Sequence, residues 1–242
     1  ENVTTGSGND VIRGHSGSNV FNTGAGNDTI YAYKGDDVLF GGLGDDFMDG
    51  AGGVDTLVFG DQDTVVNLSR SKSGVAQDTG HGNDTIITTT IENVTTGSGN
   101  DVIYAQSLDN VVKAGSGNDF IEGGNDADTL FGGDGIDVIY GSTGDDTLDG
   151  GEGSDMFVFL QSDLELGNND QDTILNFNVN EDKLSFDSLG LEDVQVDLID
   201  NEGGSDAVIS FNDHADWGSI ILVDVGRLDS EDIIIDSGVA GG

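Results

Sequence analysis

The sequence has no cysteine and no proline, and only 7 of its 242 residues are lysine or arginine. Without cysteine, the chain can form no disulfide framework, no zinc–thiolate site and no thiol nucleophile. Without proline, every residue keeps the backbone N–H that a strand ladder uses, which suits a chain of short stacked strands. The shortage of basic residues makes nucleic acid and anionic membranes poor partners.

No stretch of 18 apolar residues is present to span a membrane, and the first residues lack the basic and apolar regions of a signal peptide. Aspartate and glutamate number 47, which gives a formal net charge of −40, and 40 residues are glycine. Like charges repel and little apolar surface is available for burial, so this composition is close to that of disordered chains. We therefore expect a multivalent cation to neutralise the chain before it folds.

A nine-residue repeat, the nonad, fills most of the chain. Each nonad has a glycine-rich turn, an aspartate at its sixth position and an apolar residue at its eighth. Six nonads lie in residues 1–59 and seven in residues 92–159, with one isolated copy at 79–87. The sixth-position aspartates are the candidate metal ligands: Asp10, Asp28, Asp37, Asp46, Asp55, Asp84, Asp101, Asp119, Asp128, Asp137, Asp146 and Asp155.

Alternation along a strand points only the eighth residue of each nonad into a core. One buried side chain cannot offset the entropy lost in ordering nine residues, so the core alone should not hold the fold. Glycine in the turns permits positive φ, which lets carbonyl oxygens turn toward one point. A carboxylate and carbonyls from two stacked turns would supply the oxygen ligands that calcium prefers.

The nonads have the form GGxGxDxUx, and in this the sequence resembles the RTX proteins, whose calcium-binding repeat follows that pattern. The resemblance implies an all-β fold, a parallel β-roll in two blocks, with calcium between nonads two apart and roughly nine Ca²⁺ ions in all. Asn19 and Asn110 replace the aspartate in two nonads, where we expect weak or missing calcium. Asp126 replaces a turn glycine and is either an added ligand or a tolerated turn residue.

The pattern divides the chain into four parts. Block 1 (1–59) and block 2 (92–159) are separated by an interrupting excursion (60–91), and residues 160–242 read as a non-repetitive β cap that protects the terminal edge. Asp84 precedes Asp101 by 17 residues rather than 18, a slip that favours two separate rolls over one, although the sequence leaves both open.

The segment DTILNFNVNEDKLSF at 172–186 resembles the region that follows the repeats in type I secreted proteases, lipases and large adhesins. The resemblance, closest to the adhesin branch, implies a C-terminal module of a larger, secreted or surface-located protein of a Gram-negative bacterium. Its partners would be calcium, the type I secretion machinery and the N-terminal domains of the same longer chain, and we expect a monomer. In this interpretation, calcium-induced folding outside the cell drives and completes export.

Two other functions stay open. Aromatic residues recur at the ninth position and either form an outward ligand-binding stripe for glycan, ice or a cell surface, or pack between neighbouring coils: Tyr31, Phe40, Tyr104, Phe131 and Tyr140. A calcium-dependent polysaccharide lyase or epimerase is a remoter alternative, because none of the few basic residues shares a turn with a base. The histidines His15, His81 and His214 lack the spacing of a zinc site. We therefore expect no enzyme activity.

Overall fold

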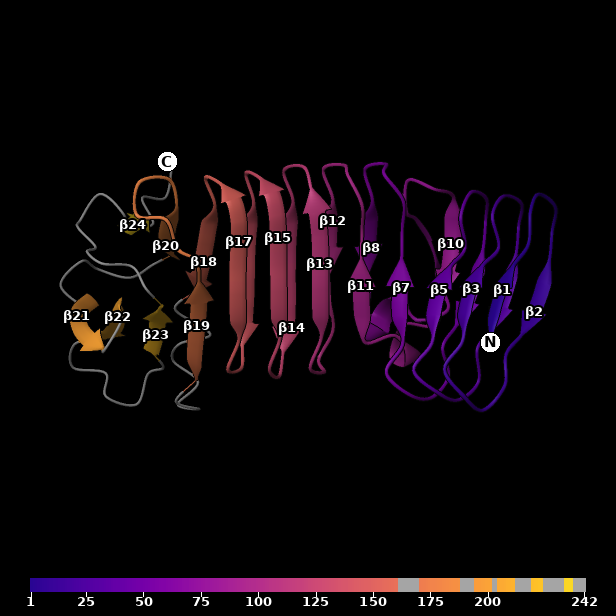
Figure 1. Cartoon of the computed structure of the whole chain (residues 1–242), viewed down its shortest axis with the longest axis horizontal. Helices are drawn as coiled ribbons and strands as arrows, with labels where there is room; N and C mark the ends of the chain where they lie inside the picture. The colour runs from indigo at the N-terminus through magenta and orange to yellow at the C-terminus, as the bar shows by residue number, and fades with distance from the viewer. Residues whose placement is uncertain (161–169, 188–193, 202–203, 212–218, 224–232, 237–242) are drawn as a thin grey trace.

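A computed structural model of the chain describes residues 1–160, 170–187, 194–201, 204–211, 219–223 and 233–236. Short strands follow one another around a flattened roll, and Figure 1 shows them stacked side by side from the N-terminal end to the cap. Two 3₁₀ turns, η1 (Arg70–Lys72) and η2 (Thr88–Thr90), lie between the blocks. Within these residues no helix is long and apolar enough to cross a membrane.

One face of the roll is a continuous sheet of 12 described strands. In spatial order these are β1 (Asn2–Thr4), β3 (Val20–Asn22), β5 (Val38–Phe40), β7 (Thr56–Val58), β11 (Asn93–Thr95), β13 (Val111–Ser116), β15 (Thr129–Gly135), β17 (Thr147–Gly153), β19 (Gln171–Leu175), β23 (Ser219–Leu222), β22 (Gly204–Phe211) and β21 (Val194–Asn201). The strands from β1 to β23 pair in parallel, and β22 and β21 then pair antiparallel.

The opposite face is divided into two sheets. The five-stranded sheet holds β2 (Val11–Arg13), β4 (Thr29–Tyr31), β6 (Phe47–Asp49), β10 (Asn83–Ile86) and β9 (Ala76–Asp78). The seven-stranded sheet holds β8 (Val65–Asn67), β12 (Val102–Tyr104), β14 (Phe120–Asn125), β16 (Val138–Thr143), β18 (Met156–Leu160), β20 (Lys183–Asp187) and β24 (Ile233–Asp236). The parallel β-roll predicted from the repeat is thus confirmed.

The excursion interrupts only this second face. β7 pairs in register with β11, so the 12-stranded sheet passes from block 1 to block 2 without a break. The isolated nonad supplies β10, which pairs with β6 of block 1, whereas β8 pairs with β12 of block 2. Asp84 and Asp101 therefore precede or lie in strands of different sheets. Their spacing of 17 residues does not mark a boundary between two rolls. The interpretation of two separate rolls was wrong on this point.

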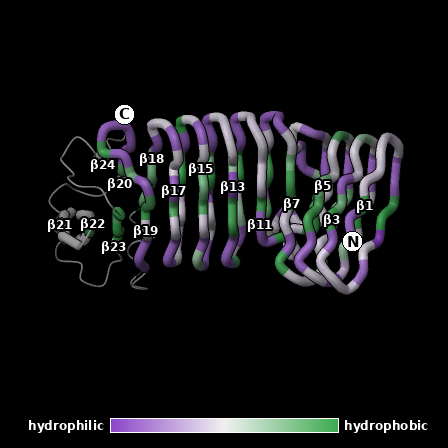
Figure 2. The backbone as a smooth tube through the Cα atoms, viewed as in Figure 1, coloured by the Kyte–Doolittle hydropathy of each residue, from purple (hydrophilic) through white to green (hydrophobic). Residues whose placement is uncertain are grey.

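The core is a single column of apolar side chains between the two faces. The eighth residue of every nonad is buried, from Ile12 at the open end to Phe157 beside the cap. The cap continues the column with Ile174 and Leu184. Figure 2 shows the hydrophobic residues on the strands and mostly hydrophilic residues in the turns between them. Because each strand contributes so little to the core, the turns at the two edges must supply much of the stability.

Candidate metal sites

The sixth-position aspartates stand where each turn enters a strand, and they form two ladders, one along each edge of the roll. In each ladder Oδ1 of one aspartate accepts a hydrogen bond from the backbone N–H of the residue two nonads earlier. Asp10 donates to Asp28 at 2.7 Å, and Asp119 donates to Asp137 at 2.8 Å. The backbone of every second nonad is thereby tied to the next carboxylate along the edge.

The first edge is formed by the turns that enter the 12-stranded sheet. Its ladder residues are Asn19, Asp37, Asp55 and Glu92, and then Asn110, Asp128, Asp146 and Asp172, because the Glu92 N–H donates to the Asp55 carbonyl oxygen rather than to Asn110. The second edge is formed by the turns that enter the divided face. Its ladder is divided too, into Asp10, Asp28, Asp46 and Asp84, and then Thr64, Asp101, Asp119, Asp137, Asp155 and Asp182.

The second carboxylate oxygen, Oδ2, is buried without a hydrogen-bond partner in ten of these aspartates: Asp28, Asp37, Asp46, Asp55, Asp101, Asp119, Asp128, Asp137, Asp146 and Asp155. A buried carboxylate oxygen without a donor is costly, because it has lost its water and gained nothing in return. Repetition of the same orphaned atom along both edges indicates a common missing partner. That partner has to be positively charged or a donor.

Burial raises the pKa of these carboxyls, as expected when a charged oxygen loses its water. Desolvation raises the pKa of Asp128 to about 8 and that of Asp137 to about 7. It raises the pKa to about 6 in Asp46, Asp55, Asp119, Asp146 and Asp155. The hydrogen bond from the neighbouring backbone N–H opposes the shift without cancelling it. The protein alone therefore disfavours the charged form, which an exposed aspartate would adopt at neutral pH.

Backbone oxygens lie close to the orphaned carboxylate oxygens. A methyl group added to Gly123 would collide with Asp128 Oδ2 and with the Gly141 carbonyl oxygen. The same holds for Gly132, where Asp137 Oδ2 and the Gly150 carbonyl oxygen approach the Cα. The first position therefore has no room for a side chain. The carboxylate of the same nonad and a carbonyl oxygen of the turn two nonads on both lie beside this glycine.

The donor set suits a hard cation. Among the described residues no three histidine, cysteine, aspartate or glutamate side chains gather as a metal cluster. Any ion at the ladder would therefore be held by single carboxylates and backbone carbonyls, an all-oxygen set that fits calcium rather than zinc. Bound there, a cation would supply the positive charge that the Oδ2 atoms lack.

Two of the twelve predicted ligands differ from the rest. Asp84 Oδ2 accepts a hydrogen bond of 2.5 Å from the Thr79 hydroxyl, so its carboxylate is already satisfied. Asp10 lies at the N-terminal end of the second-edge ladder, is only partly buried and has no buried orphaned oxygen. The structure thus brings ten of the predicted residues into one repeated environment and places these two at its margins.

Where asparagine replaces aspartate, an amide N–H group takes the place of the second carboxylate oxygen. The Asn110 side-chain N–H donates to the Glu92 carbonyl oxygen, and the neighbouring Gln106 amide donates to the Ile91 carbonyl oxygen at 2.5 Å. At Asn19 the amide nitrogen faces His15 Nε2 at 3.2 Å. Protein donors satisfy these turns, which gives a physical reason for the predicted weak or missing calcium.

Sequence reasoning missed three acidic ladder residues. Asp172 and Asp182 accept from the backbone N–H groups of Asp146 and Asp155, and Glu92 accepts from that of Asp55. Burial raises the pKa of Asp172 to about 8. A signal was present, because each stands two residues before a buried apolar side chain, as in a nonad. Asp126, by contrast, is exposed with φ of 70°, in keeping with a turn residue.

Two of the ninth-position aromatics, Tyr31 and Tyr104, pack against a ring of the coil two nonads on. Tyr31 lies 5.4 Å from Phe47 and Tyr104 lies 5.6 Å from Phe120, measured between ring centroids. Two of the few cations lie over such rings, Arg13 over Tyr31 and Lys113 over Phe131. Of the histidines, His15 and His81 make local hydrogen bonds, and His214 lies outside the described residues.

Comparison with known proteins places the repeats in a family. The family described as RTX calcium-binding nonapeptide repeat (4 copies) matches residues 1–30, 22–57, 87–121, 104–139 and 122–157. No curated protein matches the chain. Among solved structures, the extracellular lipase LipA from Serratia marcescens is 18% identical with a TM-score of 0.29, over 95% of this chain and 38% of that chain. The chain thus spans well under half of the lipase's length.

Proposed function

Because the chain belongs to the RTX calcium-binding nonapeptide repeat family, we propose that it is a module whose calcium-driven folding outside the cell completes the secretion of a larger protein. The observation that carries this proposal is the row of buried Oδ2 atoms that no protein donor satisfies. An ion that binds only the folded chain adds its binding free energy to folding, so binding and folding become one equilibrium.

Calcium level then sets the state of the chain. At low cytosolic calcium the net charge of −40 and the unsatisfied carboxylates favour the unfolded chain, which fits a narrow export channel. Outside, millimolar calcium neutralises the ladders, and each ion ties a turn to the turn two nonads away. The predicted ligands remain the twelve sixth-position aspartates, and the proposed number of ions remains roughly nine. Asp172 joins them as a further candidate ligand.

The cap is where folding would begin. β19 and β20 extend the two faces of block 2 in parallel, and Asp172 and Asp182 extend both ladders into the cap. On each edge, a folded cap thus supplies a strand with which the adjoining nonad can pair and a carboxylate that accepts its backbone N–H. We propose that the roll then grows from the cap toward the N-terminal end.

We propose no catalytic role for the module. The family is typically a structural calcium-binding unit, and Arg13 and Lys113 lie over aromatic rings on the strands rather than in a ladder turn. Incubation with alginate and with pectate tests the lyase and epimerase alternative, and turnover by the calcium-loaded chain would revive it.

Far-ultraviolet circular dichroism of chelator-stripped chain, titrated with calcium and separately with magnesium, tests the central claim. We expect a steep coil-to-β transition at about 0.1–1 mM calcium and none with magnesium. Asp137→Asn should move the midpoint to higher calcium. Asp134→Asn removes the same charge from an exposed position of the same nonad and should leave the midpoint in place. A β signal that ignores calcium would refute calcium-driven folding.

Export is tested in cells that carry a type I transporter. The chain should reach the medium faster when millimolar calcium is present outside, and Asp137→Asn should slow its appearance while Asp134→Asn does not. Export at one rate with and without external calcium would contradict the secretion role and leave calcium-driven folding untouched.

A further inference from the structure

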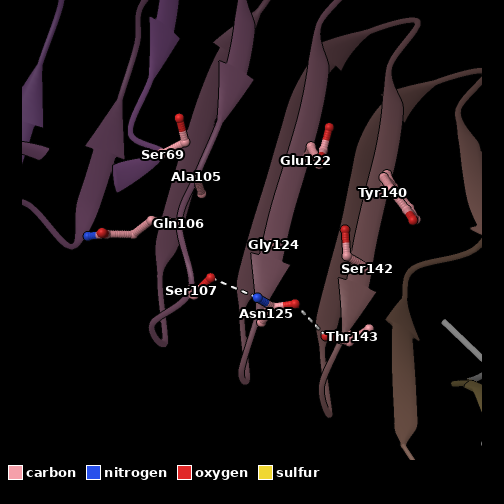
Figure 3. Close-up of a pocket in the computed structure, with 10 residues that line it drawn as sticks. All are labelled: Ser69, Ala105, Gln106, Ser107, Glu122, Gly124, Asn125, Tyr140, Ser142 and Thr143. Atoms are coloured by element: carbon pink, nitrogen blue, oxygen red, sulfur yellow. Dashed lines mark hydrogen bonds between the residues drawn. The ribbon is translucent and has the colours of Figure 1, made fainter. Parts of the chain in front are cut away.

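A hollow of about 430 Å³ lies on the outer surface of the seven-stranded sheet, within the size range of small-molecule sites. Figure 3 shows its walls, with Glu122 and Asn125 from β14, and Tyr140, Ser142 and Thr143 from β16. Ser107 and Gln106 come from the turn after β12, and Ser69 of the excursion stands at the far side. We call this hollow the β14–β16 groove.

A chain of side-chain hydrogen bonds crosses the groove. Asn125 Nδ2 donates to Ser107 Oγ at 2.7 Å, and Thr143 Oγ1 donates to Asn125 Oδ1 at 2.9 Å, as the dashed lines in Figure 3 mark. Both bonds fix the orientation of the Asn125 amide. A primary amide has two N–H groups and two acceptor positions, so one N–H and one acceptor position remain for a ligand.

Within block 2 the departures from second- and fourth-position turn glycine lie at or beside this groove, whereas block 1 has its own at His15, Tyr33 and Ala51. Gln106 and Ser142 occupy the second turn position, which is glycine in most nonads, and Ser142 adopts φ of 77°. Asp126, next to Asn125, adopts φ of 70° where the fourth-position glycine would stand. A non-glycine residue at positive φ carries a conformational cost that packing of the roll does not require. In return, polar side chains line an otherwise glycine-rich surface.

Charge narrows the class of ligand. The chain carries −40 overall, so phosphates, sulfates and uronates are repelled. A fixed amide with adjacent donor and acceptor matches two vicinal hydroxyl groups. Serine and threonine hydroxyls can donate or accept as required, and a tyrosine ring offers an apolar surface to the C–H face of a sugar. These features together describe a neutral polyol.

We propose that the β14–β16 groove binds a neutral oligosaccharide. Asn125 contacts a pair of hydroxyl groups, the Tyr140 ring contacts an apolar sugar face, and Thr143 is a positioning residue that orients Asn125. The proposal requires only the folded roll and is independent of the role in secretion. It assigns ligand binding to one of the ninth-position aromatics, Tyr140, which has polar side chains beside it in the groove.

Isothermal titration calorimetry of the full calcium-loaded chain tests the proposal with cellohexaose, chitohexaose and mannohexaose as probes, and with hexaguluronate as the anionic comparison. We expect at least one neutral probe to bind and hexaguluronate to bind less tightly. Asn125→Ala and Tyr140→Ala should each weaken binding about tenfold or more, equivalent to the loss of one or two good contacts.

Two further variants separate recognition from folding. Thr143→Val keeps the side-chain shape and removes only the hydroxyl that orients Asn125, so affinity should fall less than in Asn125→Ala. Tyr31→Ala removes a tyrosine from the same nonad position in block 1, against Phe47 and away from the groove, and should leave affinity unchanged. Circular dichroism at millimolar calcium verifies that each variant is folded.

Three results would overturn the groove proposal: no heat with any neutral probe, tighter binding of hexaguluronate than of every neutral probe, or an equal loss of affinity in Tyr31→Ala. None of these results would bear on the calcium transition, which is measured separately.

Discussion

At the scale of single residues, the two oxygens of one sixth-position carboxylate differ in their hydrogen bonding. Oδ1 is used by the protein, as an acceptor for a backbone N–H two nonads away, and Oδ2 is left over. The difference explains why aspartate suits the sixth position. Asparagine can accept through Oδ1, but its second group is itself a donor and excludes a cation.

The variant Asn110→Asp tests this exchange of amide for ion. It removes the donor to the Glu92 carbonyl oxygen and creates an orphaned Oδ2. Without calcium, the folded form should lose about 1–3 kcal/mol, the cost of unsatisfied buried acceptors. At saturating calcium, calorimetry should count one more ion per chain.

The matched control is Asn118→Asp, the same chemical change at an exposed turn position whose Oδ1 accepts from Ile136. Its ion count should equal that of the parent chain. An unchanged count in Asn110→Asp would mean that the amide is not what keeps calcium from this turn.

At the scale of one strand, the two faces carry very different energetic weight. On β13, Val112 is fully buried in the core whereas its neighbour Val111 is 36% exposed. The two valines allow the same substitution to be compared on the two faces. Val112→Ala should lower the free energy of unfolding by about 2 kcal/mol at saturating calcium, through lost burial and the cavity left behind.

Urea denaturation at saturating calcium measures the difference. Val111→Ala should change the free energy of unfolding by no more than about 0.5 kcal/mol, as is usual for surface sites. Equal effects of the two substitutions would mean that the single inward residue does not define the core.

At the scale of the whole molecule, pH should act in opposite directions with and without calcium. In the metal-free roll the pKa of Asp128 is about 8 and that of Asp137 about 7, above the value of 3.8 for an exposed carboxyl. The folded state then binds more protons than the unfolded state between about pH 4 and 8, so its stability falls as pH rises through that window. With calcium bound, acid instead competes with the ion for the carboxylates.

Circular dichroism from pH 8 to pH 5 checks both directions. Metal-free chain should gain β signal on acidification, and a chain carrying Asp128→Asn and Asp137→Asn should gain less. Calcium-loaded chain should lose stability over the same range. A metal-free signal that is flat with pH would show that desolvated carboxylates are not what opposes folding.

Local patterns in the sequence predicted much of this architecture. The nine-residue period places every eighth residue in the core and every sixth at a turn, because both follow from strand alternation and turn chemistry. Asp172 and Asp182 could also have been predicted as ladder residues, because each stands two residues before a buried apolar side chain. The pairing of β7 with β11 could not be predicted in this way. It depends on which strands meet after the 34 residues that lie between Val58 and Asn93. The β14–β16 groove could not be predicted either, because three coils and the excursion together form its walls.

The divided face also determines how the roll would carry a load. Between the blocks, one continuous sheet joins the two halves. On the other face the described contacts are scattered hydrogen bonds, among them Asn67 N–H to the Gln77 side chain at 2.8 Å, the Gln77 side chain to the Asn67 carbonyl oxygen at 3.3 Å and Val65 N–H to the Thr79 carbonyl oxygen at 3.4 Å. The second-edge ladder ends at Asp84 and begins again at Thr64, so no repeated carboxylate link crosses this boundary. Tension along the roll axis should therefore concentrate at this boundary. The excursion is the point at which we expect the roll to be mechanically weakest.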